Sequence, residues 1–122
     1  SAWTDFAAEG KSYQNNKDKD PFFGSGTIPL PKKSYSGDYD FHHPYISPKY
    51  GDYKNFCDLL MFVGSHELIE SDTLDLAEKV DNAIVHDFEG MFHVFPLGFN
   101  KMASSRAAWR LIYEFIEEKL RS

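Results

Sequence analysis

A carboxylate and a histidine follow two apolar segments of this chain, in the order in which many acyl hydrolases carry their acid and their general base. Glu67 lies in the segment GSHE at 64–67, and His93 lies in the segment GMFHVF at 90–95. In such enzymes the carboxylate fixes the tautomer of the imidazole, which then takes the proton of a nucleophile. This order is the one expected for two of the three groups of a catalytic triad, whereas the other interpretation is a structural histidine and a solvated loop carboxylate.

The third group, a nucleophilic serine, is not identified by any motif. The pattern G-x-S-x-G, which presents such a serine at a sharp turn between a strand and a helix, does not occur among the 122 residues. Ser25 lies between two glycines, but Phe23 stands where the motif needs its first glycine. We therefore do not interpret Ser25 as a nucleophile.

The segments before the acid and the histidine have the patterns of parallel strands. Residues 59–63 form a short apolar run closed by Gly64, which is typical of a strand buried on both faces. Residues 83–88 form the next strand candidate. A helix capped by Ser71 or Asp72 is predicted between them, so the three elements form a parallel crossover.

This arrangement predicts where the chemistry lies. Ligands of open parallel sheets bind beyond the carboxyl ends of the strands, and both Glu67 and His93 follow such ends. We therefore expect the two side chains to meet. Gly90 permits a tight turn before the histidine. Three further residues are expected to shield its ring from bulk water: Phe92, Phe95 and Pro96.

The length corresponds to one domain at most, 1–122, in which two parts differ in pattern. Residues 1–56 show no sustained periodicity and are predicted to form an ordered, aromatic-rich excursion, with 24–40 as its loosest part. Residues 57–122 are orderly and end in an amphipathic helix from Ser104 to about Leu120. Its predicted core positions have helical spacing: Ala108, Leu111, Ile112, Phe115 and Ile116.

Composition excludes several classes of function. The net charge is -6 and the basic residues are scattered, so nucleic acid is not an expected partner. The chain has no apolar run long enough to span a membrane, and its one cysteine, Cys57, is expected to be a small buried residue. A cytoplasmic location is the expectation. His42 and His43 lack further ligands at zinc spacing, so we predict a surface turn, no metal site and no cofactor.

Five segments of the chain match a known family in the family's own order. They are SAWTD at 1–5, DPF at 20–22, PYISP with YGD at 44–52, GSHELI at 64–69 and GMFHVF at 90–95. They resemble segments of the bacterial esterases of the hormone-sensitive-lipase-like group in the α/β-hydrolase superfamily. Ala2 replaces the proline that is usual in the first segment.

The resemblance implies roles for the two residues introduced above. It makes His93 the general base and Glu67 its acidic partner, at a position where the family more often has aspartate. In an alignment one residue shorter, His66 would take the acid position and the triad would be broken. A carboxylate is the competent group, so Glu67 is preferred, with Glu70 and Asp72 as alternatives.

The resemblance also implies an architecture. The chain is expected to be the C-terminal part of an α/β-hydrolase fold, from just after strand six to the last helix, with about two parallel strands in an incomplete sheet. Strand 59–63 would then have an open edge, which favours pairing with another chain. The expected partners are the missing N-terminal hydrolase half or a second copy of the chain.

The predicted function is that of part of a serine carboxylesterase that hydrolyses small acyl esters. The chain would supply the histidine and the acid but not the nucleophile, so by itself it is expected to be inactive. The alternative is a non-catalytic, oligomeric binding or assembly protein derived from a hydrolase. Six aromatic residues are candidates either for an acyl pocket or for packing against the missing half: Phe22, Phe23, Tyr35, Tyr39, Phe41 and Tyr45.

Overall fold

The centre of the structure is a pair of parallel strands. A computed structural model describes residues 1–24 and 32–122, so Ser25 and part of the 24–40 segment lie outside the described residues. Strands β1 (Leu59–Gly64) and β2 (Ala83–Phe88) pair along their whole length, with Gly64 opposite Phe88. Both predicted strands are confirmed.

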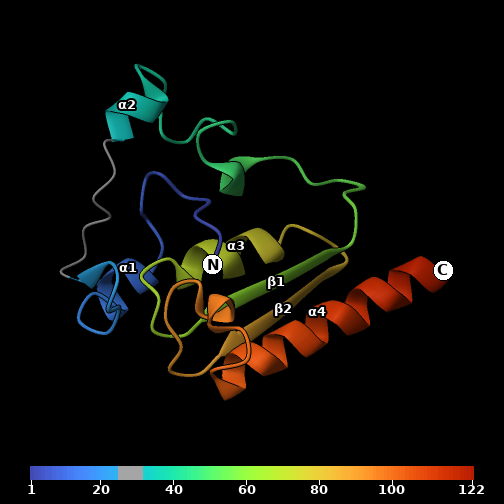
Figure 1. The fold of residues 1–122 in the computed structure, drawn as a ribbon. Helices are drawn as coiled ribbons and strands as arrows, with labels where there is room; N and C mark the ends of the chain where they lie inside the picture. Colours follow the sequence, from blue (N-terminus) through green and yellow to red (C-terminus); the bar gives the residue numbers. More distant parts are fainter. Residues whose placement is uncertain (25–31) are drawn as a thin grey trace.

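Helices lie on either side of this sheet. Helix α3 (Glu70–Ala77) connects β1 to β2, and α4 (Ala103–Arg121) follows the loop after β2. Figure 1 shows the two strands running between α3 and α4. The long C-terminal helix is confirmed, and Ala108 on its apolar side is fully buried. The predicted core position Ile116 is corrected: it lies near the end of the helix and is 47% exposed. The remaining described elements are short: α1 (Ser12–Asn15), α2 (Lys32–Ser36), and the 3-10 turns η2 (Pro48–Tyr50) and η3 (Phe95–Gly98).

The N-terminal segment is held against α3 by buried polar contacts. The backbone N–H groups of Thr4 and Asp5 donate to Oδ2 of Asp72 at 2.9 and 2.8 Å. The hydroxyls of Ser12 and Ser71 each accept a backbone N–H from the other residue. These contacts place an excursion with little regular structure of its own directly beside the loop that follows β1.

The predicted cap of the helix after β1 is wrong. Helix α3 begins at Glu70 after Ile69, and no side chain caps that end. Asp72 and Ser71 instead bind the N-terminal segment, as described above. Serine and aspartate are residue types that favour helix capping, which is why the local sequence predicts a cap here. Their hydrogen bonds to a distant segment of the chain cannot be read from the neighbouring residues.

Two predictions of burial are also corrected. Cys57 is exposed, because it lies in the loop that leads into β1 rather than in the core. In β1, Met61 and Val63 are buried, but Phe62 is only half-buried. The strand is therefore covered more completely on one face than on the other. Across residues 1–24 and 32–122, none of the helices has the length and apolar character needed to cross a bilayer.

Candidate active site

Glu67 and His93 meet at the carboxyl end of the sheet. Figure 1 shows the N-terminus close to the loops that follow β1 and β2 at this end. Nδ1 of His93 lies 3.1 Å from Oε2 of Glu67. The carboxylate is fully buried, and the histidine side chain is 21% exposed. The sheet thus brings together a buried acid and an imidazole with access to the surface.

The buried carboxylate of Glu67 is well supplied with hydrogen-bond donors. Its Oε1 accepts the backbone N–H of Gly64 at 2.7 Å and the hydroxyl of Ser1 at 2.7 Å. A buried carboxylate without such donors would be costly, because burial removes the hydration of its charge. The two bonds fix Oε1, so that Oε2 is directed at the imidazole.

The loop that carries His93 is held by its backbone. Gly90 has a φ of 72°, which confirms the predicted tight turn, and its N–H donates to Oγ of Ser65 at 2.9 Å. Val94 has a φ of 53° and a ψ of 30°, an unusual conformation for a β-branched residue. Phe95 is fully buried and packs on Phe88, with ring centroids 4.8 Å apart. The histidine is therefore presented by a tightly folded loop anchored in the core.

The acid loop and the histidine loop touch at Gly64. A Cβ at this position would lie 2.2 Å from the backbone oxygen of Met91. The same oxygen accepts the N–H of His66 at 3.1 Å. Glycine is required here because two backbones approach each other, and not because of its φ.

The aromatic rings that contact His93 belong to Phe22 and Phe23 in the N-terminal segment, and not to the residues that were predicted to shield it. The ring centroid of Phe23 lies 4.8 Å from that of His93, and that of Phe22 lies 6.3 Å from it. Phe92 stacks on Phe22 rather than on the histidine, and Phe95 packs into the core. The expected shielding by Phe95 is thus corrected, because its ring packs into the core, and Phe92 reaches the site only through its stacking on Phe22.

Asp20 explains how the two phenylalanines reach the histidine. Its Oδ1 accepts the N–H groups of Phe22 and Phe23 at 2.8 and 3.0 Å. Its Oδ2 accepts the N–H of Leu68, next to the acid, at 2.6 Å. A single buried carboxylate therefore ties this aromatic turn to the acid loop.

The alternative acids lie away from the histidine. Oε2 of Glu70 accepts the side-chain N–H of Asn16 at 2.8 Å. Burial raises the pKa of Glu70, and that of nearby Asp87 is raised by burial as well. Asp72 binds the N-terminal segment. Within residues 1–24 and 32–122, Glu67 is the carboxylate that is hydrogen-bonded to His93.

His42 and His43 lie in a turn, as predicted, in which His42 is exposed and His43 is half-buried. Nδ1 of His42 lies 2.9 Å from Oδ1 of Asp40, and its Nε2 lies 2.8 Å from Oε1 of Glu9. Hydrogen bonds to Asp40 and to Glu9 raise the pKa of His42. No cluster of three or more metal-ligating side chains occurs in the part of the chain that the structure describes.

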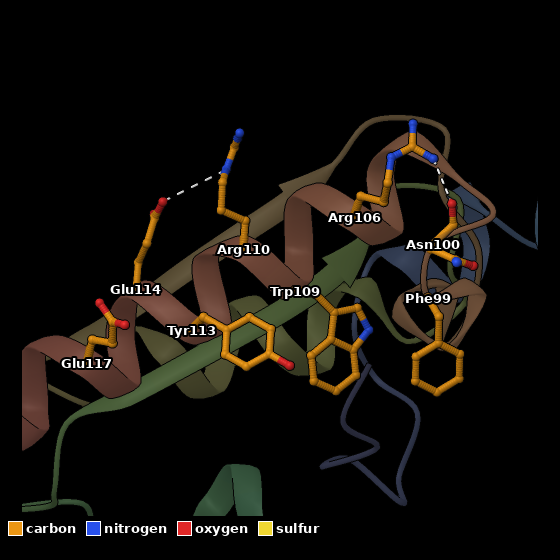
Figure 2. A pocket seen from close by; sticks show the side chains of 8 residues that line it. All are labelled: Phe99, Asn100, Arg106, Trp109, Arg110, Tyr113, Glu114 and Glu117. Carbon is orange, nitrogen blue, oxygen red and sulfur yellow. Dashed lines mark hydrogen bonds and ion pairs between the residues drawn. The ribbon is translucent and has the colours of Figure 1, made fainter.

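A separate groove lies along α4. Figure 2 shows the rings of Phe99, Trp109 and Tyr113 projecting on one side of the helix, and the rings of Phe99 and Trp109 stack with centroids 5.7 Å apart. Neither Glu67 nor His93 lines this groove. It is therefore not part of the candidate active site. Its lining residues are Phe99, Asn100, Arg106, Trp109, Arg110, Tyr113, Glu114 and Glu117.

Several known proteins that are similar to this chain in sequence or structure are named as hydrolases, esterases or lipases. The chain is 29% identical over 99 residues to an acetyl-hydrolase of Streptomyces hygroscopicus. The aligned region covers 78% of the chain and 33% of the acetyl-hydrolase. The crystal structure of EstE5 soaked with ethyl alcohol matches 98% of the chain at 25% identity, with a TM-score of 0.89. A hormone-sensitive lipase from a metagenome library matches 94% of the chain at 28% identity, with a TM-score of 0.81.

The chain spans only part of these relatives. It covers 42% of the EstE5 chain, 41% of the metagenomic lipase and about a third of the acetyl-hydrolase. The similarity to hormone-sensitive-lipase-like esterases, predicted from five short segments, is confirmed by these matches. A family model described as alpha/beta hydrolase fold matches residues 1–97. The chain therefore belongs to the alpha/beta hydrolase fold family.

Proposed function

We propose that this chain supplies the general base, His93, and its acidic partner, Glu67, to a serine hydrolase that cleaves small carboxylic esters. The observation that carries the proposal is the fully buried carboxylate bound to Nδ1 of an accessible imidazole. The acetyl-hydrolase and the metagenomic hormone-sensitive lipase among the relatives support this class of substrate.

The geometry defines how the pair would work. With Nδ1–H donating to Glu67, the lone pair of the imidazole lies on Nε2, and no group in residues 1–24 and 32–122 forms a hydrogen bond with that atom. Nε2 would take the proton of a serine hydroxyl as the serine oxygen bonds to the ester carbonyl carbon. Glu67 would stabilise the resulting imidazolium without taking its proton.

The remaining steps return the site to its starting state. The tetrahedral intermediate breaks the bond to the alkoxy oxygen, which receives the proton from Nε2 and leaves as an alcohol. Water then attacks the acyl-serine and gives one proton to Nε2. When this second intermediate collapses, the serine recovers that proton and the carboxylic acid is released.

The nucleophile and the donors to the oxyanion are proposed to come from polypeptide outside these 122 residues. The sequence has no G-x-S-x-G motif, and the chain spans less than half of its structural relatives. The nitrogen of Ser1 donates to the carbonyl oxygen of Phe62 in β1. Backbone at Ser1 therefore lies beside the strand edge that is not paired with β2, where a third strand would extend the sheet.

The experiment that tests the proposal is an ester hydrolysis assay on the assembled protein, in which this chain is joined by the nucleophile-bearing polypeptide. His93→Ala should reduce kcat for p-nitrophenyl acetate by at least about 10³-fold, because the serine loses its base. His43→Ala is the matched control, since His43 lies in the surface turn. Robust turnover that survives His93→Ala would overturn the assignment of the base.

A labelling experiment locates the nucleophile. A fluorophosphonate probe followed by intact-mass measurement should label a serine on the polypeptide outside the 122 residues. If the chain instead forms a stable assembly of identical copies in which no serine reacts, the non-catalytic assembly protein becomes the better description.

A further inference from the structure

We propose that Ser1 is a positioning residue, whose hydroxyl holds the acid and the histidine loop in one hydrogen-bonded bridge. The inference rests on the proposed function of Glu67 and His93. Oγ of Ser1 donates to Oε1 of Glu67 at 2.7 Å and accepts the backbone N–H of Val94 at 3.0 Å. Ser1 thus contacts the acid directly and the residue immediately after the base.

The chemistry of the two neighbours explains why a hydroxyl stands here. An ionised carboxylate only accepts hydrogen bonds, and a backbone N–H only donates them. A hydroxyl has one proton to give and lone pairs to accept with, so a single oxygen satisfies both groups. The Val94 N–H orders the hydroxyl, because an oxygen that accepts from Val94 is left with its proton for Glu67.

The bridge acts on a strained part of the loop. Val94 is held with a φ of 53°, a conformation that β-branched residues rarely adopt and that persists only where surrounding contacts impose it. The bond from its N–H to Ser1 is one such contact, and the burial of Phe95 is another. Relaxation of Val94 would rotate the adjacent His93, because the two residues share a peptide bond.

Ser1 is itself anchored in the sheet. Its nitrogen donates to the carbonyl oxygen of Phe62 in β1, so the hydroxyl extends from the edge of that strand. Glu67 belongs to the loop after β1, and Val94 belongs to the loop after β2. One residue therefore connects the sheet with both loops of the site, and it acts on the reaction through Glu67 and His93.

Kinetics of variants in the assembled protein test this role. Ser1→Ala is expected to lower kcat for p-nitrophenyl acetate by roughly 10- to 100-fold, with KM changed less than about twofold, because the base is misplaced while substrate binding is untouched. Ser1→Cys keeps the size of the side chain but donates weakly, and the same fall is expected. Ser1→Thr keeps the hydroxyl and should stay within about threefold of the parent.

Ser65→Ala is the matched control. Oγ of Ser65 accepts the N–H of Gly90 at 2.9 Å and thereby links the same two loops, but it bonds to neither Glu67 nor His93. Its kcat should fall less than about threefold. A comparable loss in Ser65→Ala and Ser1→Ala would mean that general loop cohesion, rather than the bridge to the acid, explains the effect of Ser1, and would overturn the proposal.

A second measurement does not depend on turnover. The Nδ1 proton of His93, hydrogen-bonded to Glu67, should give a downfield proton resonance in the assembled protein, which Ser1→Ala and Ser1→Cys should broaden or shift and Ser1→Thr should retain. If Ser1→Cys changes neither the resonance nor kcat, the role of Ser1 is refuted, while the proposed function of Glu67 and His93 still stands. Turnover that survives His93→Ala refutes instead the proposed function on which it rests.

Discussion

Nδ1 of His93 lies 3.1 Å from Oε2 of Glu67, although 26 residues separate the two positions along the chain. The parallel register brings them together, since Gly64 at the end of β1 lies opposite Phe88 at the end of β2. The acid follows the first strand by three residues, and the histidine follows the second strand by five. The contact between the acid and the histidine thus follows from the parallel crossover between β1 and β2, and substitutions in either loop test it.

Replacing the acid should impair the chemical step. Glu67→Gln is expected to lower kcat for p-nitrophenyl acetate by about 10²- to 10⁴-fold with little change in KM, because an amide does not stabilise the imidazolium as a carboxylate does. Glu70→Gln is the control, since Glu70 binds Asn16 and not the histidine. Steady-state kinetics of the two variants identify the acid: a larger loss of kcat in Glu70→Gln than in Glu67→Gln would assign that role to Glu70.

Adding a methyl group where the loops touch should damage both stability and activity. Gly64→Ala places a Cβ 2.2 Å from the backbone oxygen of Met91, so the backbone of the histidine loop must move. We expect a loss of about 2–3 kcal/mol in the free energy of unfolding, measured with urea, and a fall in kcat of more than about tenfold. Gly24→Ala has open space around its Cβ and should preserve both quantities.

A buried ion pair under the N-terminal segment should matter for stability. Nζ of Lys49 lies 3.1 Å from Oδ2 of Asp5 and 2.8 Å from Oδ2 of Asp75, and the side chain of Asp5 is fully buried. Lys49→Met leaves Asp5 with backbone donors but no cation, which should cost about 2–3 kcal/mol in urea unfolding. Lys119→Met removes a partner from half-exposed Asp58 and should cost much less. Equal losses in the two variants would contradict this account.

The raised pKa of Asp72 should make the free energy of unfolding depend on pH. Burial raises the pKa of its carboxyl to about 7, although the N–H groups of Thr4 and Asp5 favour the charged form. Since the folded pKa lies above the unfolded value of about 3.9, the stability that Asp72 contributes is fully present below pH 4 and is lost as the pH rises through 7. Asp72→Asn should therefore gain roughly 2–4 kcal/mol relative to the parent between pH 4 and pH 8.

The measurement is urea unfolding of parent and variant at several pH values. An asparagine oxygen can still accept the two backbone N–H groups, so the contact with the N-terminal segment is preserved. Asp18→Asn, at an exposed position, provides the control. Parallel curves of unfolding free energy against pH for parent and Asp72→Asn would show that this carboxyl does not titrate differently on folding.

Features that depend on neighbouring residues were predictable from the sequence. The apolar run at 59–63 predicts the first strand, and the β-branched residues Ile84 and Val85 followed by Phe88 favour the second. Helical spacing predicts the C-terminal helix, and a glycine at position 90 predicts the turn before the histidine. Together with the crossover, these patterns were sufficient to bring Glu67 and His93 to the same end of the sheet.

Contacts between distant segments were decided only by the tertiary structure. Ser1 binds Glu67 across 66 residues, and Phe23 packs on His93 across an even longer stretch of chain. Asp72 has the residue type of a helix cap but binds Thr4 instead. Periodicity reports which face of an element is buried, whereas the position of an irregular segment depends on hydrogen bonds that form only once the sheet and its loops are in place. The sequence therefore determined the acid and the base as candidates, and the folded chain decided what holds them together.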